Sequence, residues 1–267
     1  MSEMVYRQPV WWGAQSFDTS QGRHWYLAGM NLSIIRHARE WQFQIERTPA
    51  QSEDNHDWHR DDHLPESPLG ELRRYVFRQT TEVLELLPRM ADRSVVIRPV
   101  MPLFVPPGQD ITFYVSTPVW VSCHAQDQDT PLLDMPVVRP ADTWFGPNMV
   151  KGEICYTTKV SGHLDLSQLT PRPFRAVTPV QIRNLGNDIM PVERINLPVP
   201  FLPIYAAESG RLWTPTLHVT MEQHQRVPRI RIDTSISTEA GHVTLLNPAR
   251  RGSEEHALIR VFDNLID

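Results

Sequence analysis

The sequence predicts an all-β, sandwich-like protein with many short, proline-bounded strands and one helix at its C-terminal end. Two stretches, residues 94–123 and 177–205, are rich in β-branched and aromatic residues and are repeatedly interrupted by proline. Because proline cannot donate a hydrogen bond to a strand ladder, the strands in these stretches must be short. The chain has 24 prolines, 12 glycines and 40% hydrophobic residues, which is typical of a turn-rich β protein rather than a helical bundle.

The N-terminal part, residues 10–47, has the pattern of half-buried strands. Trp41, Phe43 and Ile45 alternate with polar residues, which is the two-residue period of a strand with one face in a core. Residues 71–87 fit both helical and strand spacing, and we favour two strands there.

Residues 48–68 are polar and charged, and they predict a loop or an insertion because they cannot bury enough apolar surface to order themselves. This segment contains the best candidate metal ligands, His56, His59 and His63, with four aspartates among residues 54–62. Imidazole and carboxylate groups at this spacing can share a divalent ion. The alternative, which we favour, is a solvated acidic loop without a metal.

The two long stretches give the middle of the chain its predicted strands and turns. Ile111, Phe113 and Val115 alternate with Thr112 and Tyr114, as in a strand. A chain reversal is predicted at Pro106-Pro107-Gly108 and a turn at 184–187. Further strands are predicted at 153–159, 212–221 and 228–237.

The end of the chain, residues 254–266, places five apolar residues on one face of a predicted helix. Such a stripe must be buried, either against the protein's own sheet or in a groove of another subunit or partner. Leu258, Phe262 and Leu265 are therefore candidate partner-binding residues.

Length and composition limit the organisation and the compartment. The 267 residues fit a single β-rich domain, 1–267, or two small β subdomains, 1–90 and 91–267. The chain contains two cysteines and does not start with a signal-peptide pattern, so we expect a reduced, cytoplasmic protein. No apolar run approaches the roughly 18 residues that span a bilayer, and the net charge of −5 argues against general nucleic-acid binding.

No motif predicts a catalytic residue or a cofactor. Cys123 next to His124 suggests an activated thiol, but adjacent strand residues point to opposite faces, so buried packing is favoured. His163 and Asp165 have the spacing of a base and its orienting carboxylate, yet no nucleophile motif accompanies them, and a turn is favoured.

Aromatic residues are the remaining candidates for binding. Tryptophan near arginine can form a stacking or protein-binding surface, although core packing is the favoured interpretation. In an adjacent aromatic pair on a strand, one ring faces away from the other, so some aromatic surface should be exposed or covered by a second layer. The candidates are Trp11-Trp12, Trp25-Tyr26, Trp120, Trp144-Phe145 and Trp213.

The stretch VVIRPVMPLFVPPGQDITFYVSTPVWVSC resembles the pattern of the domain of unknown function 432 family (DUF432). Phe145-Gly146-Pro147, Gly152-Glu153-Ile154-Cys155 and the Asn184 turn follow in the same order, so the resemblance covers roughly residues 80–220. The chain departs from the family pattern at Tyr156-Thr157, where a basic-aromatic pair is usual. The family has no established activity. Its members are sometimes encoded beside small-conductance mechanosensitive channels, and the resemblance therefore implies a soluble accessory role.

These observations favour a non-enzymatic binding or accessory protein with a protein partner or self-association, and without direct membrane insertion. Two alternatives remain open. One is a metal-dependent enzyme centred on the histidine segment, and the other is a carbohydrate-binding β-sandwich, which depends on fold analogy alone.

Overall fold

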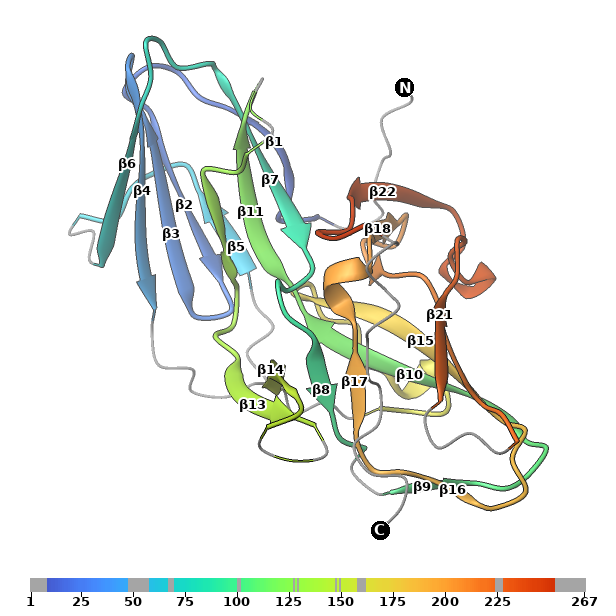
Figure 1. Ribbon diagram of the computed structural model, residues 1–267. Coiled ribbons are helices and arrows are strands. Elements are labelled where there is room, and N and C mark those ends of the chain that lie inside the picture. The colour runs from blue at the N-terminus through green and yellow to red at the C-terminus, as the bar shows by residue number, and fades with distance from the viewer. Residues whose placement is uncertain are drawn as a thin grey trace. The chain divides into compact units, whose positions relative to one another are not determined.

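The computed structural model describes residues 9–47, 58–66, 70–99, 102–126, 128, 130–146, 148, 150–157, 162–223 and 228–252. Their regular structure consists of β-strands and three short 3-10 helices, which confirms the all-β prediction (Figure 1). The predicted C-terminal helix with Leu258, Phe262 and Leu265 lies outside the described residues, as does His56. The chain divides into two compact units. One comprises Gln8–Arg89 and Val119–Arg139, and the other Met1–Arg7, Met90–Pro118 and Pro140–Asp267.

The N-terminal unit is a sandwich of two antiparallel sheets. One has the order β5-β2-β3-β4-β6, and the other has the order β1-β7-β11-β12. In Figure 1, β6, β4, β3 and β2 lie in one layer, and β11, β7 and β1 lie in the other. The first sheet comprises β2 (Gly22–Leu27), β3 (Met30–Arg36), β4 (Glu40–Arg47), β5 (Trp58–Asp61) and β6 (Glu71–Val76). The second comprises β1 (Gly13–Ser16), β7 (Val83–Arg89), β11 (Trp120–Ala125) and β12 (Leu133–Pro136).

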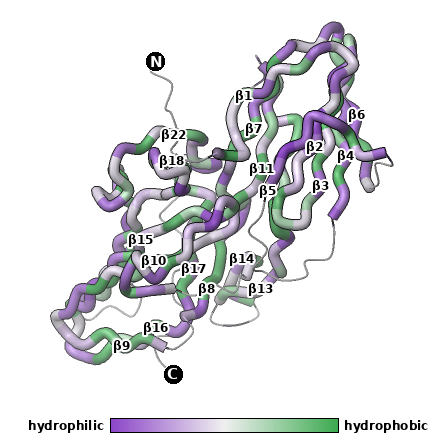
Figure 2. The backbone as a smooth tube through the Cα atoms, turned by 180° about the vertical axis from the view of Figure 1, so that it is seen from behind, coloured by the Kyte–Doolittle hydropathy of each residue, from purple (hydrophilic) through white to green (hydrophobic). Residues whose placement is uncertain are grey.

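The core of this unit follows from the two-residue period of its strands. Hydrophilic and hydrophobic residues alternate along them (Figure 2). Trp41 and Phe43 of β4 are fully buried, as predicted, and the Phe17 ring meets the Trp41 ring edge-on at 5.1 Å between centroids. Leu84 and Leu86 of β7 are also fully buried. Burial of each such side chain stabilises the fold by roughly 1.5–3 kcal/mol.

Two predictions in the N-terminal unit have opposite outcomes. Residues 71–87 form the strands β6 and β7, as favoured. The prediction of a loop over 48–68 is wrong for Trp58–Asp61, which forms β5 and pairs with β2 in an antiparallel manner. An edge strand is held by backbone hydrogen bonds on one side and tolerates charged side chains, so its polar composition did not reveal it.

The C-terminal unit is built around the long antiparallel pair of β10 (Asp110–Pro118) and β15 (Arg175–Asn184). Besides β10, the sheet of β15 contains β18 (Ile204–Ala207), β19 (Leu212–Trp213), β20 (Leu217–Met221), β21 (Arg229–Ile232) and β22 (Val243–Asn247). A four-stranded sheet contains β8 (Val95–Ile97), β13 (Ala141–Phe145), β14 (Glu153–Thr157) and β17 (Ile195–Leu197). The remaining strands, β9 (Leu103–Val105) and β16 (Met190–Val192), pair with each other. The 3-10 helices are η1 (Leu166–Gln168), η2 (Val199–Phe201) and η3 (Thr238–Ala240).

Both faces of β10 are covered, so the alternation in its sequence does not mark a solvent-exposed face. Phe113 and Val115 are buried on one face, and Tyr114 and Ser116 are buried on the other. Tyr114 packs in a cluster with Val177 and Trp213, against which Ile236 and Val243 also pack. A second layer therefore covers the side of β10 that carries its polar residues.

Both predicted turns are confirmed, and they lie side by side at one end of this pair, where Asp110 is opposite Arg183. The buried Asn184 side chain donates to the carbonyl oxygens of Val105 and Asp188, both at 2.8 Å, and accepts from the Gly186 amide at 3.0 Å. Gly108 lies in the adjacent reversal with φ +73°, a conformation that glycine adopts without strain. One buried amide thus joins the two proline-rich stretches.

Candidate ligand site in the N-terminal unit

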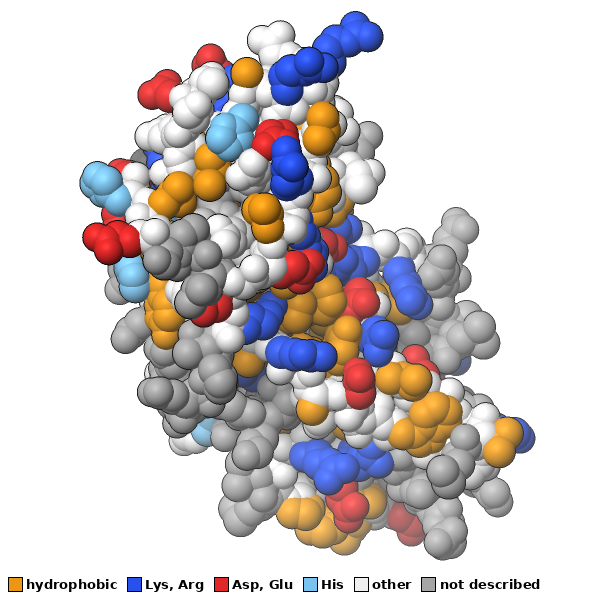
Figure 3. Space-filling view, turned by 90° about the vertical axis from the view of Figure 1, so that its left-hand side faces the viewer, with side chains coloured by type: hydrophobic (Ala, Val, Ile, Leu, Met, Phe, Trp, Pro, Cys, Tyr) orange, Lys and Arg blue, Asp and Glu red, His pale blue; other side chains and the backbone are white. Residues whose placement is uncertain are grey.

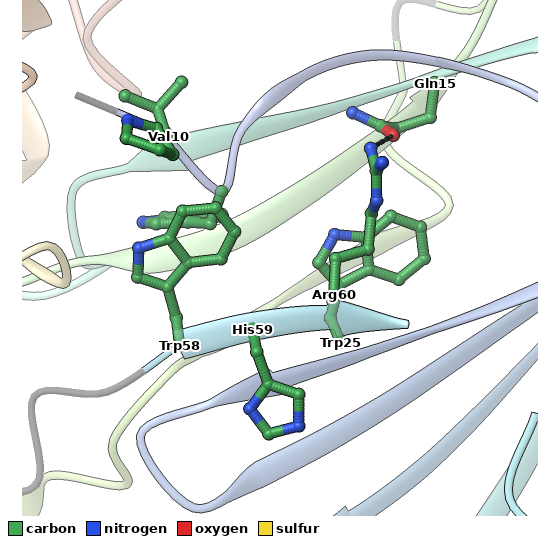
Figure 4. A pocket seen from close by; sticks show the side chains of 8 residues that line it. Val10, Gln15, Trp25, Trp58, His59 and Arg60 are labelled. Atoms are coloured by element: carbon green, nitrogen blue, oxygen red, sulfur yellow. Dashed lines mark hydrogen bonds between the residues drawn. The ribbon is translucent and has the colours of Figure 1, made fainter. Parts of the chain in front are cut away.

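A cavity of about 470 Å³ opens in the N-terminal unit, beside the edge strand β5. Its lining residues are Pro9, Val10, Trp11, Gln15, Trp25, Trp58, His59 and Arg60. In Figure 4, Trp58 and Arg60 extend from one side of β5 toward the cavity, whereas His59 extends from the opposite side. Its volume lies within the range of roughly 300–1,000 Å³ that is usual for small-molecule sites.

The strand register explains why these side chains meet. Arg60 is paired with Trp25 and Trp58 with Leu27 across β5 and β2. Since Trp25 and Leu27 are buried in the sandwich, their partners on β5 also face inward. Because β5 is the last strand in the order of its sheet, Trp58 and Arg60 are only partly covered and form the wall of a cavity.

Hydrogen bonds to the facing sheet hold the polar end of the cavity. Gln15 on β1 accepts with its Oε1 atom from Arg60 Nη1 at 3.1 Å and from Arg23 Nη1 at 3.4 Å. Arg23 is also fixed by Asp62, with 3.1 Å between Nε and Oδ1, and its guanidinium lies 5.0 Å from the Phe17 ring centroid. The Arg60 Nε atom is 3.6 Å from the same Asp62 oxygen. Two guanidinium groups therefore share one carboxylate.

The outer face of the same edge carries the histidines. The His59 ring stacks on Tyr26 with 5.2 Å between ring centroids, and the His24 ring is hydrogen-bonded to the Ser33 hydroxyl at 2.9 Å. Burial lowers the pKa of His24 below its usual value. Hydrogen bonds from the backbone amide and the ring of His63 lower the pKa of Asp61. Figure 3 shows histidine, acidic, basic and hydrophobic side chains interspersed on one face of the molecule.

The predicted metal ligands are only partly placed. His59 is engaged in its stack with Tyr26, and the His63 side chain is 91% exposed and bonded to Asp61. Within the described ranges, no group of three or more histidine, cysteine, aspartate or glutamate side chains is arranged to hold a metal ion. The contribution of His56 to a metal site stays a prediction.

The surroundings of the candidate thiol, Cys123, and of Asp165 agree with the packing and turn roles that we favoured. Cys123 and Cys155 are buried free cysteines, and burial raises the pKa of the Cys123 thiol strongly and that of Cys155 to about 12. His124 bonds to the Ser122 hydroxyl at 2.8 Å instead of to Cys123. Asp165 accepts from the Ser167 amide at 2.8 Å and caps η1, so it has the turn role that we favoured.

Most of the aromatic candidates belong to cores. Trp25 and Trp213 are 1% and 2% exposed. The prediction that one ring of each adjacent pair faces away is wrong for Trp11 and Trp12, whose buried rings meet edge-on with 5.6 Å between their centroids. These two residues precede β1 and are not in a strand, so the alternation rule does not apply to them.

One tryptophan of the C-terminal unit does present a ring to solvent. Trp144 on β13 is 39% exposed while its neighbour Phe145 is buried, as predicted for a strand pair. It is paired across the strands with Ile154, which is 57% exposed, and its indole N–H donates to the Asn148 carbonyl oxygen at 2.9 Å. An added Cβ at Gly152 would lie 2.7 Å from two ring atoms of Trp144, so the ring lies directly against the backbone.

A family model described as a protein of unknown function (DUF432) matches residues 11–267, nearly the whole chain. The chain belongs to the DUF432 family. The matched range is wider than the resemblance over 80–220 and includes six of the eight residues that line the cavity, from Trp11 to Arg60. No curated protein and no solved structure matches the chain. In the described part of this DUF432 chain, no helix is long and apolar enough to cross a membrane.

Sequence reasoning missed Gln15, Trp58 and Arg60 of this DUF432 chain as functional residues. Trp58 and Arg60 lie two positions apart, which would have placed them on one face of a strand. The acidic and histidine-rich surroundings concealed that signal. The role of Gln15 depends on a contact with Arg60 across 45 positions of sequence, which no local pattern shows.

Proposed function

We propose that this DUF432 protein is a non-enzymatic binding module, and that the cavity beside β5 is its ligand site. The observation that carries this proposal is the combination of a tryptophan-lined wall with a few fixed polar groups. Trp11, Trp25 and Trp58 provide the wall, and Gln15 and Arg60 provide the polar end. Concave sites with this composition are typical of small-molecule recognition.

The shape and chemistry of the wall favour a ligand with a ring. Indole rings bury a large area and stack on flat groups with little loss of conformational freedom. Trp25 is held in the core, so its position is fixed before a ligand arrives. Trp58 at the rim is only partly buried and can gain contact area when a ring binds against it.

A titration of intrinsic tryptophan fluorescence tests this proposal. The probes are four single-ring compounds: benzoate, benzamide, galacturonate and methyl galactoside. We expect saturable changes with at least one probe, and we expect Trp58→Ala to abolish them. The matched control is Trp144→Ala, which removes an exposed ring of the other unit and should leave binding unchanged. If no probe binds, or if Trp58→Ala binds as the wild type does, the cavity is not the ligand site.

We also propose a protein-binding role for the exposed apolar face of β13 and β14. Trp144 and Ile154, which are paired across the two strands, are 39% and 57% exposed, and Val150 in the loop between the strands is 89% exposed. Exposed apolar side chains grouped on one face are typical of protein interfaces. The Trp144 ring is already fixed by its bond to Asn148, which lowers the entropic cost of using it in an interface. Self-association or a protein partner would cover this face. The accessory role beside a mechanosensitive channel, and docking by Leu258, Phe262 and Leu265, stay predictions.

The substitution Ile154→Glu tests this second role. Light scattering at increasing protein concentration should show association by the wild type and less of it by the variant, with equal melting temperatures. The control Leu72→Glu changes an exposed leucine on β6 and should associate as the wild type does. The role would be contradicted if the wild type stays monomeric and if every protein that co-purifies with the wild type also co-purifies with Ile154→Glu.

A further inference from the structure

The side chains that line the cavity beside β5 supply hydrogen-bond donors but hardly any acceptors. Its polar lining side chains are Gln15 and Arg60, together with the indole N–H groups, which can only donate. The described lining contains no aspartate or glutamate. His59 belongs to the lining, but its ring extends from the other side of β5 (Figure 4).

The one acceptor among the lining side chains that face the cavity is already used. The Gln15 Oε1 atom has two lone pairs, and it accepts from both Arg60 and Arg23. What Gln15 can still offer a ligand is its amide N–H₂ group, which donates. The Arg60 Nη2 atom makes no hydrogen bond to any described residue, so the guanidinium also has donors to spare.

The charge beside these donors is positive, so it favours the same kind of ligand, one that accepts hydrogen bonds. Arg23 and Arg60 share Asp62, whose side chain is 56% exposed and therefore well solvated. Among the described residues, one positive charge at the polar end is thus not matched by a carboxylate in contact. Arg60 is the charged lining residue whose side chain faces the cavity.

We infer that the ligand of this cavity is a carboxylate carried on a flat, mostly apolar ring. This inference rests on the proposed ligand site. A carboxylate accepts hydrogen bonds and donates none, so it fits a wall of donors and can take two of them from one guanidinium. A neutral sugar fits less well, because each of its hydroxyl groups needs an acceptor as well as a donor. The ring lies against the tryptophans, and the carboxylate lies at Arg60.

Isothermal titration calorimetry with two matched pairs of probes tests the inference. Benzoate and benzamide have the same ring and differ in the charged group, and galacturonate and methyl galactoside form a second pair. We expect the wild type to bind benzoate at least about tenfold more tightly than benzamide, and the difference to shrink as salt is added. Galacturonate should likewise bind more tightly than the neutral sugar.

Variants of Arg60 assign the preference to its guanidinium. Arg60→Gln should bind benzoate and benzamide equally, whereas Arg60→Lys should keep part of the preference because it keeps the charge. The control Arg74→Gln removes an exposed arginine of β6, at the other edge of the same sheet, and should keep the full preference. Equal melting temperatures of the four proteins exclude unfolding as the cause.

The outcomes separate this inference from the proposed site. If benzamide binds the wild type as tightly as benzoate does and Trp58→Ala abolishes both, the site stands and the inference fails. The inference also fails if Arg60→Gln keeps the preference. If none of the four probes binds at millimolar concentration, both proposals fail.

Discussion

The two faces of β5 present different chemistry from four consecutive residues. Trp58 and Arg60 face inward and line a cavity with Trp25, whereas His59 and Asp61 face outward beside Tyr26 and His24. The outward residues have the most conspicuous sequence pattern, but in the structure they form stacks and hydrogen bonds among themselves. The inward residues form the better binding site.

The difference shows that residue type alone does not identify a site. The histidines and the aspartate on the outer strand face contact neighbouring side chains, so they need no ligand. Trp58 and Arg60, at the open edge of the core, are half covered. Ring surface of Trp58 and hydrogen-bond donors of Arg60 therefore remain available to a ligand. The predictions below separate the two faces, from the largest expected effect to the smallest.

The largest expected effect is on the free energy of unfolding of the protein, and it comes from substitutions in the neighbouring strand β2. Trp25 is 1% exposed, and Trp25→Ala should lower the free energy of unfolding by about 3–5 kcal/mol, since it removes a large core side chain. Tyr26→Ala on the outer face should cost only about 1 kcal/mol, mainly through the lost stack on His59. Urea unfolding of both variants measures the difference. Equal losses would contradict the assignment of an inner and an outer face.

The next effect concerns the affinity of the cavity. Gln15→Glu places a carboxylate between Arg23 and Arg60, where it competes with a bound anion for both guanidinium groups. We expect benzoate affinity to fall at least about tenfold while the melting temperature stays equal or rises. The control His63→Gln changes a 91% exposed side chain that does not line the cavity, and it should leave the affinity as it is. A Gln15→Glu variant with wild-type affinity would exclude Arg60 as the anion-binding group.

A smaller effect is a pH dependence that comes from the outer face. The His24 pKa is lowered from 6.5 because burial opposes its charged form, and nearby His59 lowers it further while Asp61 and Glu46 act in the opposite direction. The unfolded chain therefore binds a proton first. The contribution of His24 to the free energy of unfolding is complete above about pH 6.5. It is lost as the pH falls through the pKa of His24 in the folded protein. Unfolding measured across this range should depend less on pH in His24→Gln. An identical pH dependence in both proteins would contradict this account.

The sequence predicted most of the strands but not how they are arranged. Alternation identified β4, and proline and glycine identified the reversal at Gly108 and the turn at Asn184, because these signals are local. The parallel pairing of β15 with β19 and with β20 is not local, and no pattern within one segment encodes it.

The candidate site was harder to predict than the fold. The metal motif was prominent because histidine spacing is easy to recognise, whereas the cavity needs Gln15 of β1 and Arg60 of β5 to meet across the sandwich. Composition also misled, since a strand at a sheet edge can be as polar as a loop. Only the register between β5 and β2 shows which residues of β5 face inward.

The most direct test of the central claim, that the inner face of β5 is the ligand site, is a nuclear magnetic resonance titration of the eight tryptophan indole N–H signals with benzoate. The Trp58 signal is assigned through Trp58→Phe, and Trp25, Trp144 and Trp213 through equivalent variants. The account predicts saturable shifts of the Trp58 and Trp25 signals and none for Trp144 and Trp213, which belong to the other unit. Shifts at Trp144 with an unmoved Trp58 signal, or no shift at any indole, would contradict it.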